Sequence, residues 1–296
     1  MIDTTGLHLP NGTAADGPYP VAITPARAGW GHAGLRILDL APGGSHRFEC
    51  GADEVLVLPL WGSCGVDCDG QRFELAGRKS VLTGVSDFAY APPGSLVTIF
   101  SETGGRFALP SARASRRLAP RYMAATEVQV ELRGAGSCSR QVNNFCTPEV
   151  FEADRMIACE VLTPAGNWSS YPPHKHDEDV PGVETALEEI YYFEVAAGPG
   201  GPGFAYQRVY GTADRPLDVL AEVRSGDVVL VPHGWHGPSM APPGYDLYYL
   251  NVMAGPGEER AWLISDDPAH GWVRESWRGQ EVDPRLPMAS AVGAGS

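Results

Sequence analysis

The same order of short strands and turns runs through this chain twice, and this repeat constrains the fold more than any other feature. In the first half, a β-rich run at 35–40 leads through a Pro-Gly turn to a histidine, and a second run follows at 54–58. In the second half, a run at 156–162 leads through another Pro-Gly turn to two histidines, and a run at 189–195 follows. A repeat of this kind indicates two units of one architecture in tandem.

The composition favours β-structure in both units. The 296 residues include 36 glycines and 26 prolines, a density that favours many turns and argues against a bundle of long helices. Short β-branched and aromatic runs at this spacing predict a sandwich or a barrel. We expect an all-β chain with few short helices, one of them capped by Asp267 and reaching about Trp277. The first unit is predicted over 1–120 and the second over 121–296.

The charge excludes several classes of partner. The formal net charge is −14 at pH 7, which argues against binding to nucleic acid or to anionic lipid. The apolar runs, such as 55–61, are far shorter than the roughly 20 residues that span a bilayer. Residues 1–6 lack the basic and apolar stretches of an export signal. We expect a cytoplasmic protein, and a homo-oligomer, because exposed sheet edges need cover.

The segment His174-Lys175-His176 is the strongest functional signal. Residues i and i+2 of a strand face the same way, so both imidazoles meet one centre while Lys175 points away. Glu189 begins a later strand, and His236 follows a strand and a turn. Three imidazoles and one carboxylate suit a divalent first-row metal such as Zn, Mn, Fe, Co or Ni.

Two of these ligands have a neighbour that competes for the same role. Glu188 competes with Glu189, and the strand phase of the residues that follow favours Glu189. His233 competes with His236, and the order of spacings favours His236. The sequence leaves both choices open.

The first half lacks this ligand set. It has His46-Arg47-Phe48 where the second half has its histidine pair, and Leu96 where the second half has His236. Glu54 corresponds in this comparison to Glu189. One histidine and one carboxylate hold a divalent ion poorly, so we predict no metal in the first half.

The order of strand, His-x-His, Glu, strand, turn and His resembles the cupin superfamily, in a two-cupin arrangement. Several segments are similar to the 5-deoxy-glucuronate isomerase family of inositol catabolism. The resemblance covers about residues 30 to 280. The segments are Gly136–Val142, Pro172–Asp177, Leu187–Phe193, Gln207–Tyr210, Val231–His236 and Asp266–Val273.

The resemblance implies a bicupin, two tandem jelly-roll barrels, and a cytoplasmic aldose–ketose isomerase. The substrate would be the sugar acid 5-deoxy-D-glucuronate and the product 5-dehydro-2-deoxy-D-gluconate. The family's metal shell falls here on His174, His176, Glu189 and His236. The twelve residues between His176 and Glu189 exceed the usual cupin spacing, so they must form a loop at the barrel mouth.

Isomerisation requires groups that move a proton and groups that hold the substrate. A general base lies within about 3 Å of the proton it takes. Arginine suits a planar carboxylate because it binds in a bidentate manner. The candidates for the base are Glu188, Tyr191, Tyr249 and Lys175, those for the substrate carboxylate are Arg140 and Arg208, and that for a hydroxyl is Gln207.

Two other functions remain open at this point. The same ligand set would serve an Fe(II) dioxygenase, which oxygen consumption would reveal. A non-catalytic sugar-binding protein with two cupin units is the other alternative, and it would be expected to lack a complete ligand set.

Overall fold

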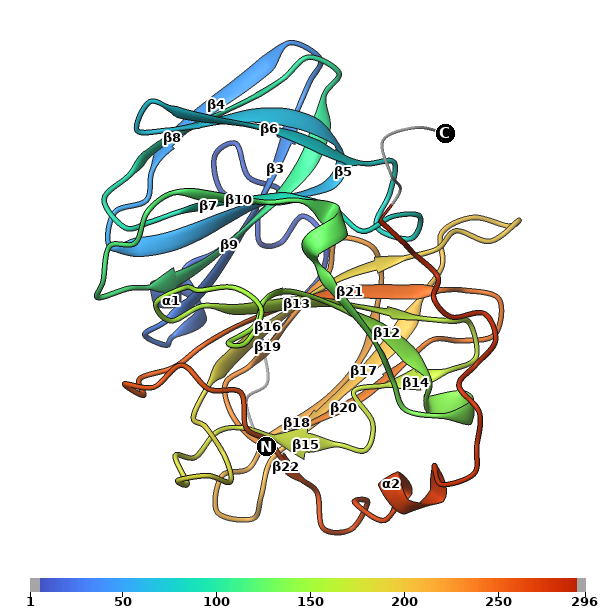
Figure 1. Ribbon diagram of the computed structural model, residues 1–296. Coiled ribbons are helices and arrows are strands. Elements are labelled where there is room, and N and C mark those ends of the chain that lie inside the picture. Colours follow the sequence, from blue (N-terminus) through green and yellow to red (C-terminus); the bar gives the residue numbers. More distant parts are fainter. Residues whose placement is uncertain (1–5, 292–296) are drawn as a thin grey trace.

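The computed structural model describes residues 6–291 and shows two curled β-units stacked on each other (Figure 1). The all-β prediction is confirmed. Helical structure in the described residues is limited to α1 (Pro25–Ala28), α2 (Val273–Ser276) and the 3-10 turns Ala125–Glu127 and Gly136–Cys138. None of these helices is long and apolar enough to cross a membrane.

The predicted helix after Asp267 is shorter than expected. Asp267 Oδ1 accepts the N–H of Ala269 at 2.8 Å, as a capping residue does. Gly271 follows within the first turn, and the chain then forms tight turns in which Val273 N–H donates to His270 O and Arg274 N–H to Gly271 O. Glycine costs helix stability, and α2 begins only at Val273.

The N-terminal unit is built on one nine-stranded sheet that bends back on itself. Its main path runs β10-β7-β5-β9-β3-β2, while β8 pairs with both β4 and the far end of the long β5, and β6 pairs with β5. The strands are β2 (Val21–Ile23), β3 (Ala33–Leu40), β4 (Gly44–Glu49), β5 (Asp53–Cys68), β6 (Gln71–Arg78), β7 (Phe88–Ala91), β8 (Leu96–Ser101), β9 (Gly105–Arg113) and β10 (Arg121–Met123).

The C-terminal unit consists of two sheets that face each other. The larger has the order β1-β19-β16-β21-β13-β12-β11, and the smaller has the order β18-β17-β20-β15-β22 with β14 beside β20. The larger sheet contains β1 (His8–Leu9), β11 (Gln129–Arg133), β12 (Arg140–Cys146), β13 (Ile157–Thr163), β16 (Glu188–Val195), β19 (Val228–Val231) and β21 (Leu247–Ala254). The smaller contains β14 (Trp168–Ser169), β15 (His174–Lys175), β17 (Ala205–Tyr210), β18 (Asp218–Val223), β20 (Trp235–Met240) and β22 (Ser265–Asp266).

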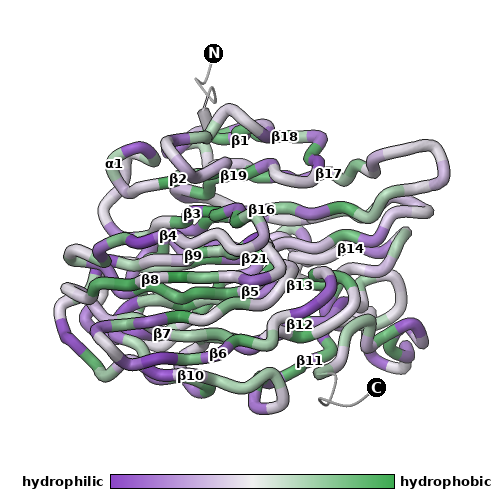
Figure 2. The backbone as a smooth tube through the Cα atoms, turned by 90° about the horizontal axis from the view of Figure 1, so that it is seen from above, coloured by the Kyte–Doolittle hydropathy of each residue, from purple (hydrophilic) through white to green (hydrophobic). Residues whose placement is uncertain are grey.

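The apolar core has three parts, one inside each unit and one between them. Alternation along a strand assigns residues to these parts. On β5, Val55 and Val57 enter the core of the N-terminal unit, whereas Leu56 and Leu58 enter the core shared by both units. Figure 2 shows the apolar stretches along the strands of both units and hydrophilic residues on many loops at the rim.

Two carboxylates, one buried and one partly exposed, join the two units reciprocally. Glu54, at the start of β5, accepts the backbone N–H groups of residues 154–156 at 2.7–2.8 Å, just before β13. Glu188, at the start of β16, accepts the backbone N–H groups of residues 31–33 at 2.8 Å, where β3 begins. Each unit therefore binds the equivalent segment of the other unit. We call these two contacts the reciprocal latch.

The latch corrects the alignment of the two halves. Glu54 makes the same kind of contact as Glu188, on the face turned to the other unit, so it does not correspond to Glu189. The residue that corresponds to Glu189 is Val55, which is fully buried in the apolar core of the N-terminal unit. The prediction that paired Glu54 with Glu189 was wrong by one residue, and a shift of one residue exchanges the two faces of a strand.

The two units exchange short segments near the ends of the expected ranges. Strand β1 pairs with β19 of the C-terminal unit, through His8 opposite Val229 and Leu9 opposite Val228. Strand β10 pairs with β7 of the N-terminal unit. A buried ion pair also crosses between the units, from Arg78 to Glu160, with both guanidinium–carboxylate distances at 2.7 Å.

Candidate metal centre and its cavity

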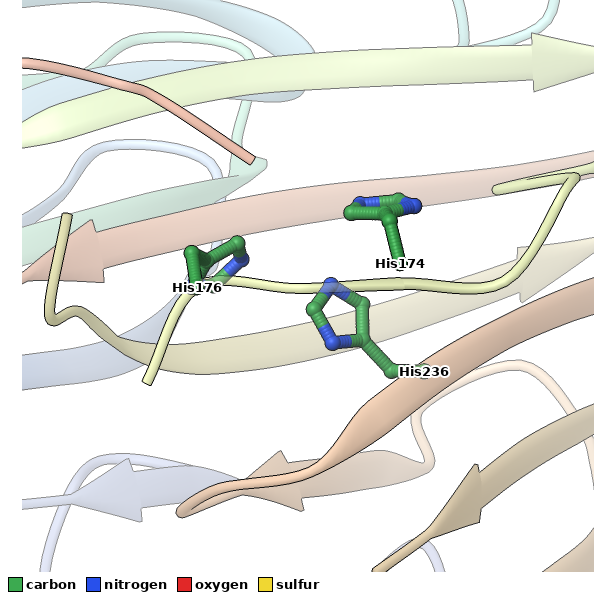
Figure 3. A group of neighbouring side chains, drawn as sticks. All are labelled: His174, His176 and His236. Atoms are coloured by element: carbon green, nitrogen blue, oxygen red, sulfur yellow. The ribbon is translucent and has the colours of Figure 1, made fainter. Parts of the chain in front are cut away.

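Three histidines converge inside the C-terminal unit. His174 and His176 lie on β15 and just after it, and His236 lies opposite on β20, directly across from His174 in the antiparallel pairing. Figure 3 shows the three imidazoles turned toward one another. One nitrogen from each ring lies within 4.8 Å of the others, a spacing that could hold a metal ion.

Backbone carbonyls fix the orientation of all three rings. The Nδ1 atoms lie 3.3–3.4 Å from the carbonyl oxygens of Pro172, Leu187 and Gly234, for His174, His176 and His236 respectively. A ring that donates its Nδ1–H to a carbonyl keeps its Nε2 lone pair free for a metal. The fold therefore directs three Nε2 atoms to one point.

Glu189 completes the group. Its Oε2 lies 3.1 Å from His176 Nε2 and 3.0 Å from His236 Nε2, and its Oε1 accepts a hydrogen bond of 2.7 Å from the Asn251 amide. Burial alone would raise the pKa of Glu189, but the neighbouring His236 and His176 outweigh it and hold that pKa far below its usual range. The carboxylate is therefore ionised, as a metal ligand must be.

An independent observation also indicates that these residues suit a metal ion. His236 Nε2 is buried and lacks an aligned hydrogen-bond partner within residues 6–291, although Glu189 is close. A buried polar atom without a partner is costly. Burial and the neighbouring imidazoles also lower the pKa of His174 well below its usual value, which keeps that ring neutral. Imidazoles and one carboxylate are a typical donor set for a divalent cation.

A cavity of about 510 Å³ opens onto this group. It lies between the smaller and larger sheets and is closed on one side by the segment that contains α2. Polar and aromatic side chains dominate its wall, as expected for a site that binds a small hydroxylated molecule. The lining includes Glu131, Arg133, Arg140, Cys159, Ser170, His174, Glu189, Tyr191, Tyr249, Asn251, Trp262, Ile264, Arg274 and Trp277.

Arg140 is the cation in this cavity that lacks an acidic partner among residues 6–291. Arg133 pairs with Glu131 at 2.8 Å, and Arg274 pairs with Asp266. Arg140 instead donates to the carbonyl oxygens of Cys138 and Tyr171. Burial, followed by the like charges of Arg133 and Arg274, lowers the pKa of Arg140 to about 10. A buried guanidinium in this state favours an incoming anion.

Two tyrosine hydroxyls meet at Ser170 on the cavity wall. The Tyr191 hydroxyl lies 2.9 Å from Ser170 Oγ, and the Tyr249 hydroxyl lies 3.5 Å from it. Ser170 has a φ of 48°, a left-handed conformation that is uncommon for residues other than glycine. Burial raises the pKa of Tyr191 and of Tyr249, so both are neutral phenols at pH 7.

The other predicted base and ligand candidates lie elsewhere. The Glu188 carboxylate is engaged by the reciprocal latch, and Lys175 points away from the histidines, as its strand phase predicts. His233 is outside the histidine group, so the geometry favours His236. On β17, Arg208 binds the Val219 carbonyl at 2.9 Å and the Asp218 carboxylate, and Gln207 is fully buried against Ser239.

Sequence reasoning missed several residues of this site. Asn251 orients Glu189, and Arg133, Arg274 and Trp277 line the cavity. Trp277 lies beneath the guanidinium of Arg140, with 5.7 Å from Arg140 Cζ to the ring centroid. Asn251 is opposite Tyr191 on the neighbouring strand, a pairing that sequence order does not reveal.

The comparisons with known proteins agree on one family. The sequence pattern of the KduI/IolB family matches residues 7–273. The 5-deoxy-glucuronate isomerase of Geobacillus kaustophilus is 41% identical over 272 residues, which cover 91% of this chain and 96% of that protein. The crystal structure of an IolB-like protein from Salmonella typhimurium has a TM-score of 0.83 at 34% identity, over 90% of this chain and 98% of that one.

A more distant structure supports the fold alone. The oxalate decarboxylase of Lactobacillus farciminis, in complex with formate, has a TM-score of 0.64 at 13% identity and covers 90% of each chain. At this identity the likeness extends to the arrangement of strands and not to the chemistry.

Proposed function

This chain belongs to the KduI/IolB family, and we propose that it is an aldose–ketose isomerase that converts 5-deoxy-D-glucuronate to 5-dehydro-2-deoxy-D-gluconate in myo-inositol catabolism. One observation supports this most directly: His174 and Glu189 of the metal-type ligand set line the same cavity as the buried guanidinium of Arg140, which has no acidic partner among residues 6–291. A sugar acid has a carbonyl end and a carboxylate end, and the two features suit those two ends.

We propose that His174, His176, Glu189 and His236 hold one divalent metal ion, with Zn, Mn, Fe, Co and Ni as the candidates. When bound, such an ion stabilises negative charge on the oxygens of the reacting carbons. The histidine orientation by backbone carbonyls and the Asn251 hydrogen bond to Glu189 support this assignment.

We propose that Arg140 binds the substrate carboxylate. Its guanidinium is desolvated and has no acidic partner in the described chain. An incoming carboxylate would therefore form an ion pair with it. The carbonyl oxygens of Cys138 and Tyr171 hold the guanidinium in place, and the Trp277 ring packs beneath it.

Tyr191 and Tyr249 act as proton donors in this proposal, not as bases. A phenol whose pKa is raised by burial keeps its proton at neutral pH and donates it to an oxygen. Ser170 Oγ lies beside both hydroxyls and holds them on the cavity wall. Glu188 and Lys175 are not retained as base candidates, and Arg208 and Gln207 are not retained as substrate ligands.

The test follows the product directly. Purified protein loaded with each candidate metal is incubated with 5-deoxy-D-glucuronate under anaerobic conditions, and the ketone is followed by NMR. We expect conversion without a redox cofactor, loss of turnover with a chelator, and no effect of oxygen. No conversion by any metal-loaded sample, or conversion only while oxygen is consumed, would refute the isomerase and favour a dioxygenase.

The ligand set has its own measurement. Metal content is compared in the wild type and in His236→Ala. The matched control is His233→Ala, because His233 lies outside the histidine group. We expect His236→Ala to lose the metal and His233→Ala to keep it, whereas the opposite result would reassign the ligand. The cytoplasmic location and a homo-oligomeric state are also proposals, which cell fractionation and light scattering would test.

A further inference from the structure

The strand that presents the first two histidines is held weakly by its backbone. Strand β15 has two residues, and it pairs with β20 through the single couple His174–His236 and with β22 through two couples. A strand this short has few ladder hydrogen bonds to fix its position. The loop 177–187 that follows it leads into β16, and it must therefore also place Glu189.

Lys175 lies on the opposite side of β15 from the two histidines and is almost fully buried. Its ammonium lies 2.9 Å from Asp177 Oδ1 and 2.8 Å from Glu184 Oε1. It also lies 2.6 Å from the largely exposed carboxylate of Glu178. These three acids are close enough to suggest a second cation site, but the lysine ammonium already lies among them.

Asp177 and Glu184 link this ammonium to the segments that carry the other ligands. Asp177 Oδ2 accepts the backbone N–H of Gly234 at 2.9 Å, two residues before His236. Glu184 Oε1 accepts the backbone N–H groups of Asp177 and Glu178 at 2.9 and 3.1 Å, which ties the loop to its own start. The loop then returns to His176, whose carbonyl accepts the N–H of Leu187 at 2.8 Å.

We propose that Lys175, Asp177 and Glu184 are positioning residues for the metal centre: together they form a brace that sets the three histidines and Glu189 at metal-binding distances. The proposal rests on the metal centre proposed above. The brace touches neither substrate nor metal, and it acts through the backbone of β15, of the loop and of the turn at Gly234.

The brace consists of buried charges that depend on one another. Breaking it by removing one partner leaves the other charges buried and uncompensated. Residues that orient metal ligands from outside typically change metal affinity by 10- to 100-fold when they are replaced. The brace should therefore be visible in metal affinity, even when the fold is intact.

The experiment titrates Co²⁺ into the metal-free full chain and follows visible absorption, which reports both affinity and ligand geometry. Asp177→Asn has nearly the same shape but cannot accept from Lys175 and from Gly234 at the same time. We expect its Co²⁺ dissociation constant to rise about tenfold or more, with an altered absorption band. The matched control is Glu178→Gln, which removes an exposed contact to the same ammonium and should change the constant less than twofold.

A second variant guards against a misfolded one. Lys175→Arg keeps the charge and should bind Co²⁺ more tightly than Lys175→Met, and circular dichroism of each metal-free variant verifies the fold. Equal affinity and equal spectra in wild type and folded Asp177→Asn would overturn the brace while leaving the metal centre intact. Failure of the wild type to bind Co²⁺, Zn²⁺ or Mn²⁺ would overturn the metal centre and the brace together.

Discussion

Replacing Glu54 with glutamine tests the reciprocal latch. The carboxylate accepts four hydrogen bonds: Oε1 from the N–H groups of Arg155 and Met156, and Oε2 from the N–H of Asp154 and the hydroxyl of Tyr90. Glutamine retains one oxygen and presents an NH₂ group in place of the other. The Tyr90 hydroxyl can turn and accept from that NH₂, but the Asp154 N–H cannot.

The expected loss of stability follows from these contacts. One buried donor left without a partner costs about 1–3 kcal/mol, and two bonds that lose their charged acceptor weaken by roughly 0.5–1 kcal/mol each. We therefore expect Glu54→Gln to lower the free energy of unfolding by about 3 kcal/mol. Glu54 is fully buried, so solvent offers little compensation.

Urea unfolding followed by tryptophan fluorescence measures this loss. The matched control is Glu74→Gln, in an exposed ion pair with Arg72 on the same unit, which should change stability by less than about 0.5 kcal/mol. A loss below 1 kcal/mol for Glu54→Gln, or a loss equal to that of the control, would show that the latch does not hold the units together.

Three further predictions concern single side chains. Arg140→Met should lower kcat/KM for the sugar acid by about 10- to 100-fold, because a charge-assisted bond contributes about 1.5–3 kcal/mol, and equal kinetics in a steady-state assay would exclude a substrate contact. Arg78→Met should lower the free energy of unfolding by about 3–5 kcal/mol, since it leaves Glu160 buried and unpaired; in urea titrations the double variant with Glu160→Met should recover part of this, and no recovery would contradict the pair. Hydrogen bonds from Arg116 and Ser115 outweigh burial and lower the pKa of Asp154 to about 2, so its stabilisation is present above about pH 4 and is lost as the pH falls toward 2. Asp154→Asn should therefore lose less stability than the wild type between pH 5 and pH 3, and parallel urea midpoints would refute this.

Local pattern was sufficient to predict the fold class and the histidine group. The alternation of side chains along a strand places His174 and His176 on one side and Lys175 on the other. This follows from three consecutive positions alone. Turn residues between short β-rich runs likewise mark the strands. These features depend on sequence distances of a few residues, which the chain displays directly.

Contacts between distant strands could not be predicted in the same way. Asn251 reaches Glu189 because β16 and β21 are neighbours in the sheet, and Trp277 reaches Arg140 because the chain returns to the cavity after the barrel is complete. The face of Glu54 was misassigned for a related reason: a strand in either of two registers shows the same residues in the same order. The contacts of Glu54 with 154–156 resolve the register, and they exist only in the folded chain.

Strand β1 has a practical consequence for anyone who divides this protein. The C-terminal barrel, expressed from residue 121 onward, would lack its first strand, because His8 and Leu9 supply the pairing partner of β19. The exposed row of N–H and C=O groups would then be available to another molecule, and such edges promote association between chains. An isolated C-terminal fragment should thus aggregate, whereas a fragment supplied with a peptide of residues 6–11 should remain dispersed at the same concentration.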